Sequence, residues 1–91
     1  MALTFVDDTE HNRYDLLRDG DRVGQIDYVV RGSALHLTHT FIEPDKREHG
    51  LAASFVQMVL DSLRGGSRTL VPDCPFIAHW LTEHPEYNDL L

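Results

Sequence analysis

The sequence is poor in cysteine and in long hydrophobic runs, and both shortages narrow the kind of protein it encodes. One cysteine among 91 residues excludes a disulfide within the chain, which fits a reducing compartment. No apolar run approaches the roughly 20 residues that a membrane-spanning helix needs. The first residues lack a basic start followed by a long apolar stretch. We therefore expect no signal peptide and a cytoplasmic location.

Basic residues are also scarce. Eight Lys and Arg stand against 15 Asp and Glu, which gives a net charge of −7 with histidine neutral. An acidic surface repels phosphate backbones, so nucleic acid is a poor candidate partner. A small anionic ligand is still compatible with this charge, because backbone N–H groups at a helix start bind phosphate whatever the net charge. The six histidines form no metal-ligand spacing with the cysteine, and we predict no metal site.

The rest of the composition is typical of a soluble globular protein, with 42% hydrophobic and 25% charged residues. A chain of 91 residues suits one small domain, which needs nearly all of its apolar residues in a single core. No repeat, linker or low-complexity segment divides the sequence. We therefore expect a single domain over residues 1–91.

The first half of the sequence alternates apolar and polar residues, as β-strands do. This pattern predicts strands at 3–7, 13–18, 23–30 and 34–42. The links between them are short and carry turn residues, so the strands are expected to form an antiparallel meander. In the last of these strands we expect one face to carry Leu35, Leu37, His39 and Phe41, and the other face to carry His36, Thr38, Thr40 and Ile42.

The second half changes to a helical period. Apolar residues recur at four-residue spacing over 51–63, which predicts an amphipathic helix. Gly65 and Gly66 follow it and are typical of a helix end. A short strand is predicted at 68–71. Because a helix connects it to the 34–42 strand, the two are expected to be parallel.

A second helix is predicted to begin at Pro75, since proline is welcome at the first helical position. Phe76, Ile77, Trp80 and Leu81 form its apolar stripe, and His84-Pro85 ends it. Trp80 and Tyr87 are best explained as packing residues for this helix and the tail. The predicted fold class is therefore α+β, with two main helices packed on a mostly antiparallel sheet of about five strands.

The segment between the 34–42 strand and the first helix is the most informative part of the sequence. A helix start exposes about four unpaired N–H groups. Arg47 adds positive charge, Gly50 has no Cβ to block close approach, and Ala52 and Ala53 are small. These features describe a cradle for a pyrophosphate. The alternative is an ordinary strand-to-helix turn that happens to contain a glycine, and spacing alone favours that alternative.

Several motifs together resemble a known family. The run Arg47–Ala52 is similar to the pyrophosphate loop of the GCN5-related N-acetyltransferases, and it lies between a strand and a helix as in that family. The match is closer to a subgroup of small single-domain members. Their features are a His-Thr pair before the loop, a Pro-x-Cys-Pro-Phe segment and a His-Pro-Glu-Tyr segment. Here these are His39-Thr40, the run 72–76 and the run 84–87, in the same order.

The resemblance implies a minimal fold of this family and a site for acetyl-CoA. The pyrophosphate would lie on the backbone amides of residues 48–53, and the pantetheine arm would run beside the 34–42 strand like an added strand. That arrangement needs the 34–42 strand to diverge from the strand after the helix. The implied coenzyme-binding residues are Thr40, Phe41, Ile42, Arg47, Glu48, His49, Gly50, Leu51, Ala52, Ala53 and Phe76.

Cys74 and His39 are the candidate catalytic residues. Pro75 as first helical residue makes Cys74 the N-cap, and in the subgroup this cysteine lies near the acyl end of coenzyme A. Cys74 would take the acetyl group as a nucleophile, line the pocket without reacting, or be a buried structural residue. His39 would act as a general base near neutral pH. The alternative, which its apolar face favours, is a hydrogen-bonded core histidine.

The resemblance thus implies an acetyl-CoA-dependent N-acetyltransferase that acts on an amine, either a small molecule or a lysine. A rival interpretation is a catalytically weak coenzyme A-binding module that acts through a protein partner, and a third is a structural domain that binds no nucleotide. The acidic surface favours a cationic acceptor through electrostatic steering. The sequence leaves the acceptor and the oligomeric state open.

Overall fold

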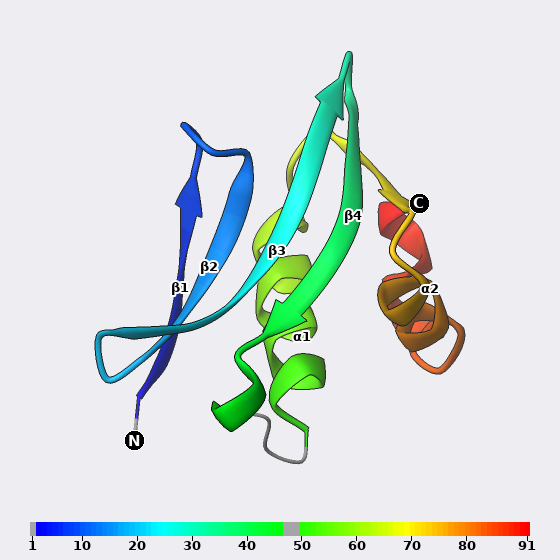
Figure 1. The fold of residues 1–91 in the computed structure, drawn as a ribbon. Helices are drawn as coiled ribbons and strands as arrows, with labels where there is room; N and C mark the ends of the chain where they lie inside the picture. Colours follow the sequence, from blue (N-terminus) through cyan, green and yellow to red (C-terminus); the bar gives the residue numbers. More distant parts are fainter. Residues whose placement is uncertain (1, 47–49) are drawn as a thin grey trace.

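A computed structural model describes residues 2–46 and 50–91 of the chain. Along the chain the elements are β1 (Leu3–Asp8), β2 (Arg13–Arg18), β3 (Asp21–Arg31), β4 (Ala34–Ile42), the 3-10 turn η1 (Pro44–Lys46), α1 (Leu51–Leu63), β5 (Thr69–Pro72), α2 (Pro75–Thr82) and the 3-10 segment η2 (Pro85–Leu90) (Figure 1). The predicted α+β order of four strands, helix, strand and helix is confirmed.

The five strands form one sheet in the order β1-β2-β3-β4-β5. Neighbours are antiparallel from β1 to β4, whereas β5 is parallel to β4 because α1 carries the chain back across the sheet. The β2–β3 and β3–β4 links are tight turns whose glycines, Gly20 and Gly32, have φ angles of 89° and 59°. Such positive values favour glycine and allow the strands to reverse in a few residues. The mostly antiparallel meander is therefore confirmed.

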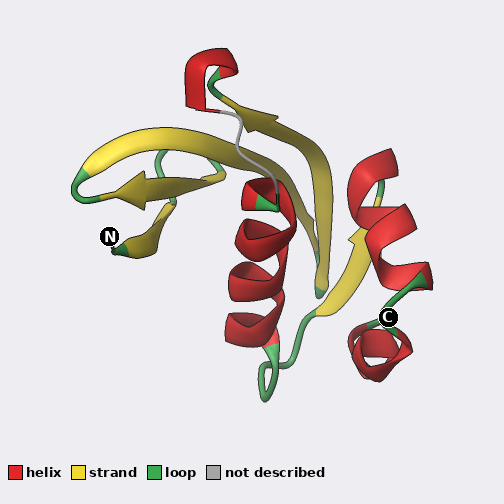
Figure 2. Ribbon diagram, turned by 90° about the horizontal axis from the view of Figure 1, so that it is seen from below, coloured by secondary structure: helices red, strands yellow, loops and turns green. Residues whose placement is uncertain are grey.

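The core lies between one face of the sheet and α1, which packs under the curved sheet (Figure 2). The apolar stripe of α1 supplies Phe55, Val56, Val59 and Leu60, all fully buried. The sheet supplies the fully buried side chains of Leu16, Val23, Ile26, Leu35 and Leu37. The helical period and the strand alternation thus meet in one continuous core, as expected for a domain of this size.

The C-terminal segment folds back onto the end of α1. The Tyr87 hydroxyl donates a hydrogen bond of 2.6 Å to Asp61 of α1. The Arg64 guanidinium lies 4.2 Å from the centre of the Tyr87 ring. Trp80 is buried and stacks on His84 with the ring centres 3.8 Å apart. Both aromatic residues assigned to packing, Trp80 and Tyr87, are buried in this way.

The opposite face of the sheet is open, because no helix of the described residues packs on it; in Figure 1 it points toward the viewer. We call it the outer face. One cross-strand row on it consists of Asp8, Arg13, Asp27 and His39. Asp15 accepts hydrogen bonds from Arg13 at 3.0 Å and from Arg22 at 2.9 Å. These partly exposed pairs make the outer face polar, and each contributes little to stability.

Tyr14 sits in an aromatic cluster, with its ring 5.9 Å from Phe5 and 5.1 Å from Tyr28. Burial raises the pKa of Tyr14 to about 12, and the carboxylate of Asp7, directly opposite on β1, adds to the rise. An unfolded chain releases the same proton near pH 10.0. Between these values the native state binds more protons than the unfolded state, so stability falls as the pH rises.

Tyr14→Phe is therefore expected to flatten the alkaline loss of stability. Urea unfolding of both proteins between about pH 8 and pH 12 measures this directly. The wild type should lose stability more steeply above pH 10, and the two curves should run parallel below it. Equal slopes throughout would contradict the assignment of the raised pKa to Tyr14.

Candidate functional site

The strands β4 and β5 diverge at one end of the sheet. They pair only from Ala34 to Leu37 on β4. The Cys74 N–H donates a hydrogen bond of 2.8 Å to the Leu37 carbonyl, and the chain then enters α2. The β4 residues 38–42 therefore have no β5 partner. We call the opening between residues 38–42 and the Cys74 end of α2 the fork. It is the divergence that a pantetheine arm beside β4 would need, and Figure 2 shows it.

A β-bulge in β4 decides which side chains face into the fork. Asp27 of β3 pairs with His39, and Tyr28 pairs with Leu37, so Thr38 is an extra residue on β4. The extra residue reverses the alternation from that point on. The prediction that Leu35, Leu37, His39 and Phe41 share one face is therefore wrong: Leu35 and Leu37 are buried, whereas His39 and Phe41 lie on the outer face and are exposed.

The same bulge turns Thr40 and Ile42 toward the side of the sheet that α1 covers. Ile42 is buried there. The Thr40 hydroxyl lies 3.4 Å from the Cys74 sulfur, close enough for either atom to donate a hydrogen bond to the other. The part of β4 that does not pair with β5 and the start of α2 thus meet through the side chains of Thr40 and Cys74.

Cys74 occupies the position that its proline neighbour predicts. It is the N-cap of α2, with extended φ and ψ angles of −70° and 123°, and Pro75 is the first helical residue. Its side chain is buried, with only 5% of the residue exposed. The thiol therefore lines the inner side of the fork beside Thr40.

His39 is not a core histidine, and that interpretation of it is overturned. It is exposed and lies opposite Asp27 on the outer face. Because side chains alternate along a strand, His39 points to the other face of the sheet from Thr40, which contacts the Cys74 sulfur. The two candidate catalytic residues therefore lie on opposite faces of β4. This arrangement gives His39 access to solvent but no hydrogen bond to the thiol.

The start of α1 follows the end of β4 in the chain, after η1. Gly50 is the N-cap, with a φ angle of 79°, and it makes no side-chain cap hydrogen bond. The first bond within the helix runs from the Ser54 N–H to the Gly50 carbonyl at 2.9 Å. The N–H groups of Leu51, Ala52 and Ala53 therefore have no acceptor within the helix.

These N–H groups suit a phosphate group. The first turn of α1 contains no acidic residue, and its exposed positions carry only small side chains. An atom placed at the Cβ position of Gly50 would meet no atom of residues 2–46 or 51–91 within 4 Å, so these residues leave the approach open. The residues present thus fit a bound pyrophosphate. The predicted contacts of Arg47, Glu48 and His49 lie outside the described residues.

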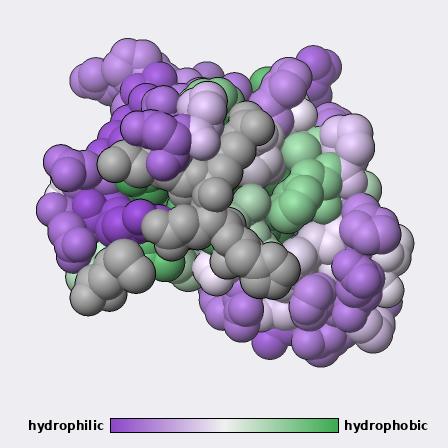
Figure 3. Space-filling view, turned by 60° about the horizontal axis from the view of Figure 1, so that its bottom comes forward, coloured by the Kyte–Doolittle hydropathy of each residue, from purple (hydrophilic) through white to green (hydrophobic). Residues whose placement is uncertain are grey.

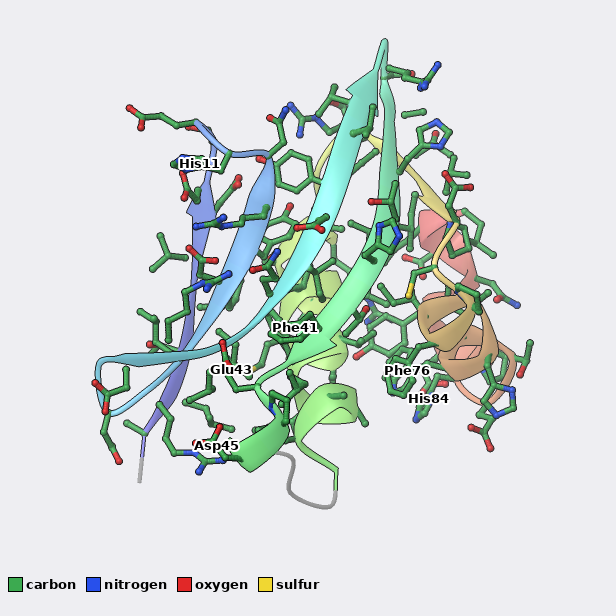
Figure 4. All side chains as sticks on the ribbon, viewed as in Figure 1. His11, Phe41, Glu43, Asp45, Phe76 and His84 are labelled. Atoms are coloured by element: carbon green, nitrogen blue, oxygen red, sulfur yellow. The ribbon has the colours of Figure 1, made fainter. Side chains whose placement is uncertain are left out.

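Two exposed phenylalanines flank the fork. Phe41, 40% exposed, lies on β4, and Phe76, 42% exposed, lies on the first turn of α2 (Figure 4). The space-filling view of this end shows a recessed hydrophobic patch bordered by hydrophilic surface (Figure 3). Exposed apolar surface beside a stretch of β4 that does not pair with β5 suits a ligand that has both apolar and amide parts.

One pair of interacting side chains at the fork, His36 and Asp73, was not predicted from the sequence. The Nδ1 atom of His36 lies 2.9 Å from Asp73 Oδ2. His36 is directly opposite Val71 on β5, and Asp73 follows Val71 by two residues, so both side chains emerge on the same face. The parallel pairing of the two strands was predicted, but its register was not, and only the register brings these residues together.

The described residues also bear on metal binding and on membrane insertion. They contain no group of three or more His, Cys, Asp and Glu side chains arranged to hold a metal ion. None of the helices seen there has both the length and the apolar character to cross a bilayer.

The family comparison agrees with this geometry. The model of a family described as GCN5-related N-acetyl-transferase matches residues 13–90, which is nearly the whole chain. The chain therefore belongs to the GCN5-related N-acetyltransferase family, and its five-stranded sheet with two main helices is a minimal form of that fold. Membership supports an acetyltransferase type of function in general. No curated protein matches the chain.

Proposed function

We propose that the protein binds acetyl-CoA at the fork and transfers the acetyl group to an amine of a small molecule or a lysine. The observation that carries this proposal is the continuity of the site. The part of β4 without a β5 partner begins beside Cys74 and leads to the open N-terminus of α1. An elongated ligand with an anionic end and an amide-rich arm matches that order of features.

Each part of the site has a role in this proposal. The N–H groups of Leu51, Ala52 and Ala53 bind the pyrophosphate, assisted by the loop residues 47–49. The pantetheine arm runs beside residues 40–42 of β4, and Phe76 covers the arm from α2. The coenzyme supplies an acetyl group already activated as a thioester. The chain has to hold that thioester against an amine and to accept a proton from the amine.

In this proposal the two candidate catalytic residues act from different sides. Cys74, buried beside Thr40, forms the inner wall at the acyl end. His39, exposed on the outer face, accepts the proton of an amine that approaches from solvent. The acetyl group passes directly from sulfur to nitrogen, and the thiolate of coenzyme A leaves.

Turnover of labelled acetyl-CoA with a panel of amines tests these roles. His39→Ala is expected to lower kcat by about 10²-fold, the usual contribution of a general base. The kcat of Cys74→Ala should stay within about tenfold of the wild-type value, because direct transfer needs no acyl-enzyme. His11→Ala, a histidine variant at the β1–β2 turn, serves as the control and should be unchanged. Loss of all turnover in Cys74→Ala would contradict a role for Cys74 as a wall of the site only.

A coenzyme-binding module that acts through a protein partner is the second candidate. The uncovered outer face favours it, because no helix of the described residues encloses an acceptor site there. Calorimetry separates the candidates: acetyl-CoA that binds without being consumed by any amine supports the module. No heat of binding at about millimolar acetyl-CoA, where even a weak complex forms, would overturn both candidates.

A further inference from the structure

A pair of polar side chains bridges the two strands at the point where they begin to diverge. His36 belongs to β4, and Asp73 is the first residue after β5. Their side chains meet at 2.9 Å and remain partly exposed, at 23% and 50% respectively. Asp73 is also the residue immediately before Cys74. The pair therefore holds the turn that carries the thiol.

The turn is held from both faces of the sheet. On the outer face His36 binds Asp73, and on the inner face Thr40 contacts the Cys74 sulfur at 3.4 Å. In the plane of the sheet the Cys74 N–H bonds the Leu37 carbonyl at 2.8 Å. After this point the chain enters α2 and the pairing with β4 ends. This turn therefore joins the last paired residues of the two strands to the first turn of α2.

We propose that His36 and Asp73 are positioning residues that fix the β5–α2 turn and thereby set the width of the fork at its acyl end. Nδ1–H of His36 donates to the Asp73 carboxylate, which orients the imidazole and restrains the residue next to Cys74. The role in acyl transfer rests on the proposed function. The restraint on the turn does not, and it can be measured without any ligand.

The single cysteine provides that measurement. Cys74 is 5% exposed, so a thiol reagent reaches it only when the turn opens. Because the chain has one cysteine, every thiol adduct in the intact mass is an adduct of this residue. The pair lies outside the hydrophobic core, so its loss should open the turn without unfolding the domain. Alkylation by iodoacetamide under native conditions therefore measures the restraint.

His36→Ala and Asp73→Ala are each expected to speed this alkylation by about fivefold, the most that a partly exposed pair usually supplies. The double variant should be no faster than either single one, because both remove the same contact. Asp73→Asn removes the charge beside the thiol but keeps an oxygen that accepts from Nδ1–H. The alkylation rate of Asp73→Asn should therefore stay within about twofold of the wild-type rate.

His11→Ala is the matched control. It breaks a similar pair, His11 Nδ1 with Asp8 Oδ2 at 2.8 Å, at the β1–β2 turn away from the fork. Its alkylation rate should equal that of wild type. Unchanged rates in His36→Ala and Asp73→Ala would overturn the proposal. An Asp73→Asn protein that is alkylated as fast as Asp73→Ala would also overturn it. In that case the charge of Asp73, and not its contact with His36, would control the reactivity of the Cys74 thiol.

Turnover provides the second measurement. His36→Ala should lower kcat by about tenfold with an unchanged KM for acetyl-CoA, because misplacement at the acyl end affects the transition state more than the distant pyrophosphate contacts. A raised KM with unchanged kcat would contradict a positioning role. If wild-type protein binds no acetyl-CoA, the proposed function fails, while the alkylation series still decides whether the pair restrains the turn.

Discussion

Gly24→Ala is expected to lower the free energy of unfolding by about 1–3 kcal/mol, the usual cost of forcing extra atoms into a packed interior. Gly24 lies on β3 opposite Ile42, the last residue of β4. A Cβ added there would lie 2.6 Å from Ile42 Cδ1 and 2.8 Å from the Phe41 carbonyl oxygen. Side chains can rotate away, but the carbonyl can move only if β4 moves. Urea denaturation measures the loss.

The Ile42→Val background separates the two clashes. It removes the Cδ1 atom and leaves the Phe41 carbonyl in place, so it should recover only part of the stability lost in Gly24→Ala. Full recovery would show that the side chain alone is responsible. Partial recovery would mean that the clash with the Phe41 carbonyl displaces β4 beside the fork. The affinity for acetyl-CoA should then fall more than the loss of folded protein alone explains. Gly24 thus connects the packing of the sheet to the shape of the proposed site.

The fold could be predicted because its signals are local. The apolar spacing of α1 lies between Gly50 and Gly65, and Pro75 marks the first residue of α2. The alternation of the first four strands and the short turns between them define a meander without any long-range information. The parallel placement of β5 follows from the helix that precedes it. For these elements local preference and tertiary packing agree, so the sequence pattern was sufficient.

The candidate site was predicted only in part, because its geometry depends on strand register. The bulge at Thr38 reverses the faces of His39 and Phe41, yet nothing in the local sequence marks it: threonine and histidine suit either face of a strand. The contact between Thr40 and Cys74 needs both this bulge and the parallel pairing. The candidate site residues could therefore be identified from the sequence, but the residues that contact them could not.

Gly50→Val is expected to weaken acetyl-CoA binding by at least about tenfold, since the N-cap conformation shapes the proposed cradle. Gly50 has a φ angle of 79°, a region that costs a residue with a Cβ about 1–2 kcal/mol. A clash is not the expected cause, because an added Cβ meets no atom of the described residues within 4 Å. The backbone must instead rotate, and this changes the directions of the N–H groups that follow.

Gly65→Val is a closely matched control. Gly65 lies just past the other end of α1 and has a φ angle of 84°. A Cβ added to Gly65 also meets no atom of the described residues within 4 Å. Both variants should therefore lose similar stability in urea denaturation. Only Gly50→Val should lose affinity in calorimetry, since only that end of α1 presents free N–H groups. Equal loss of affinity in both would trace the effect to the helix as a whole. Unchanged affinity in Gly50→Val would show that the pyrophosphate does not bind at the start of α1.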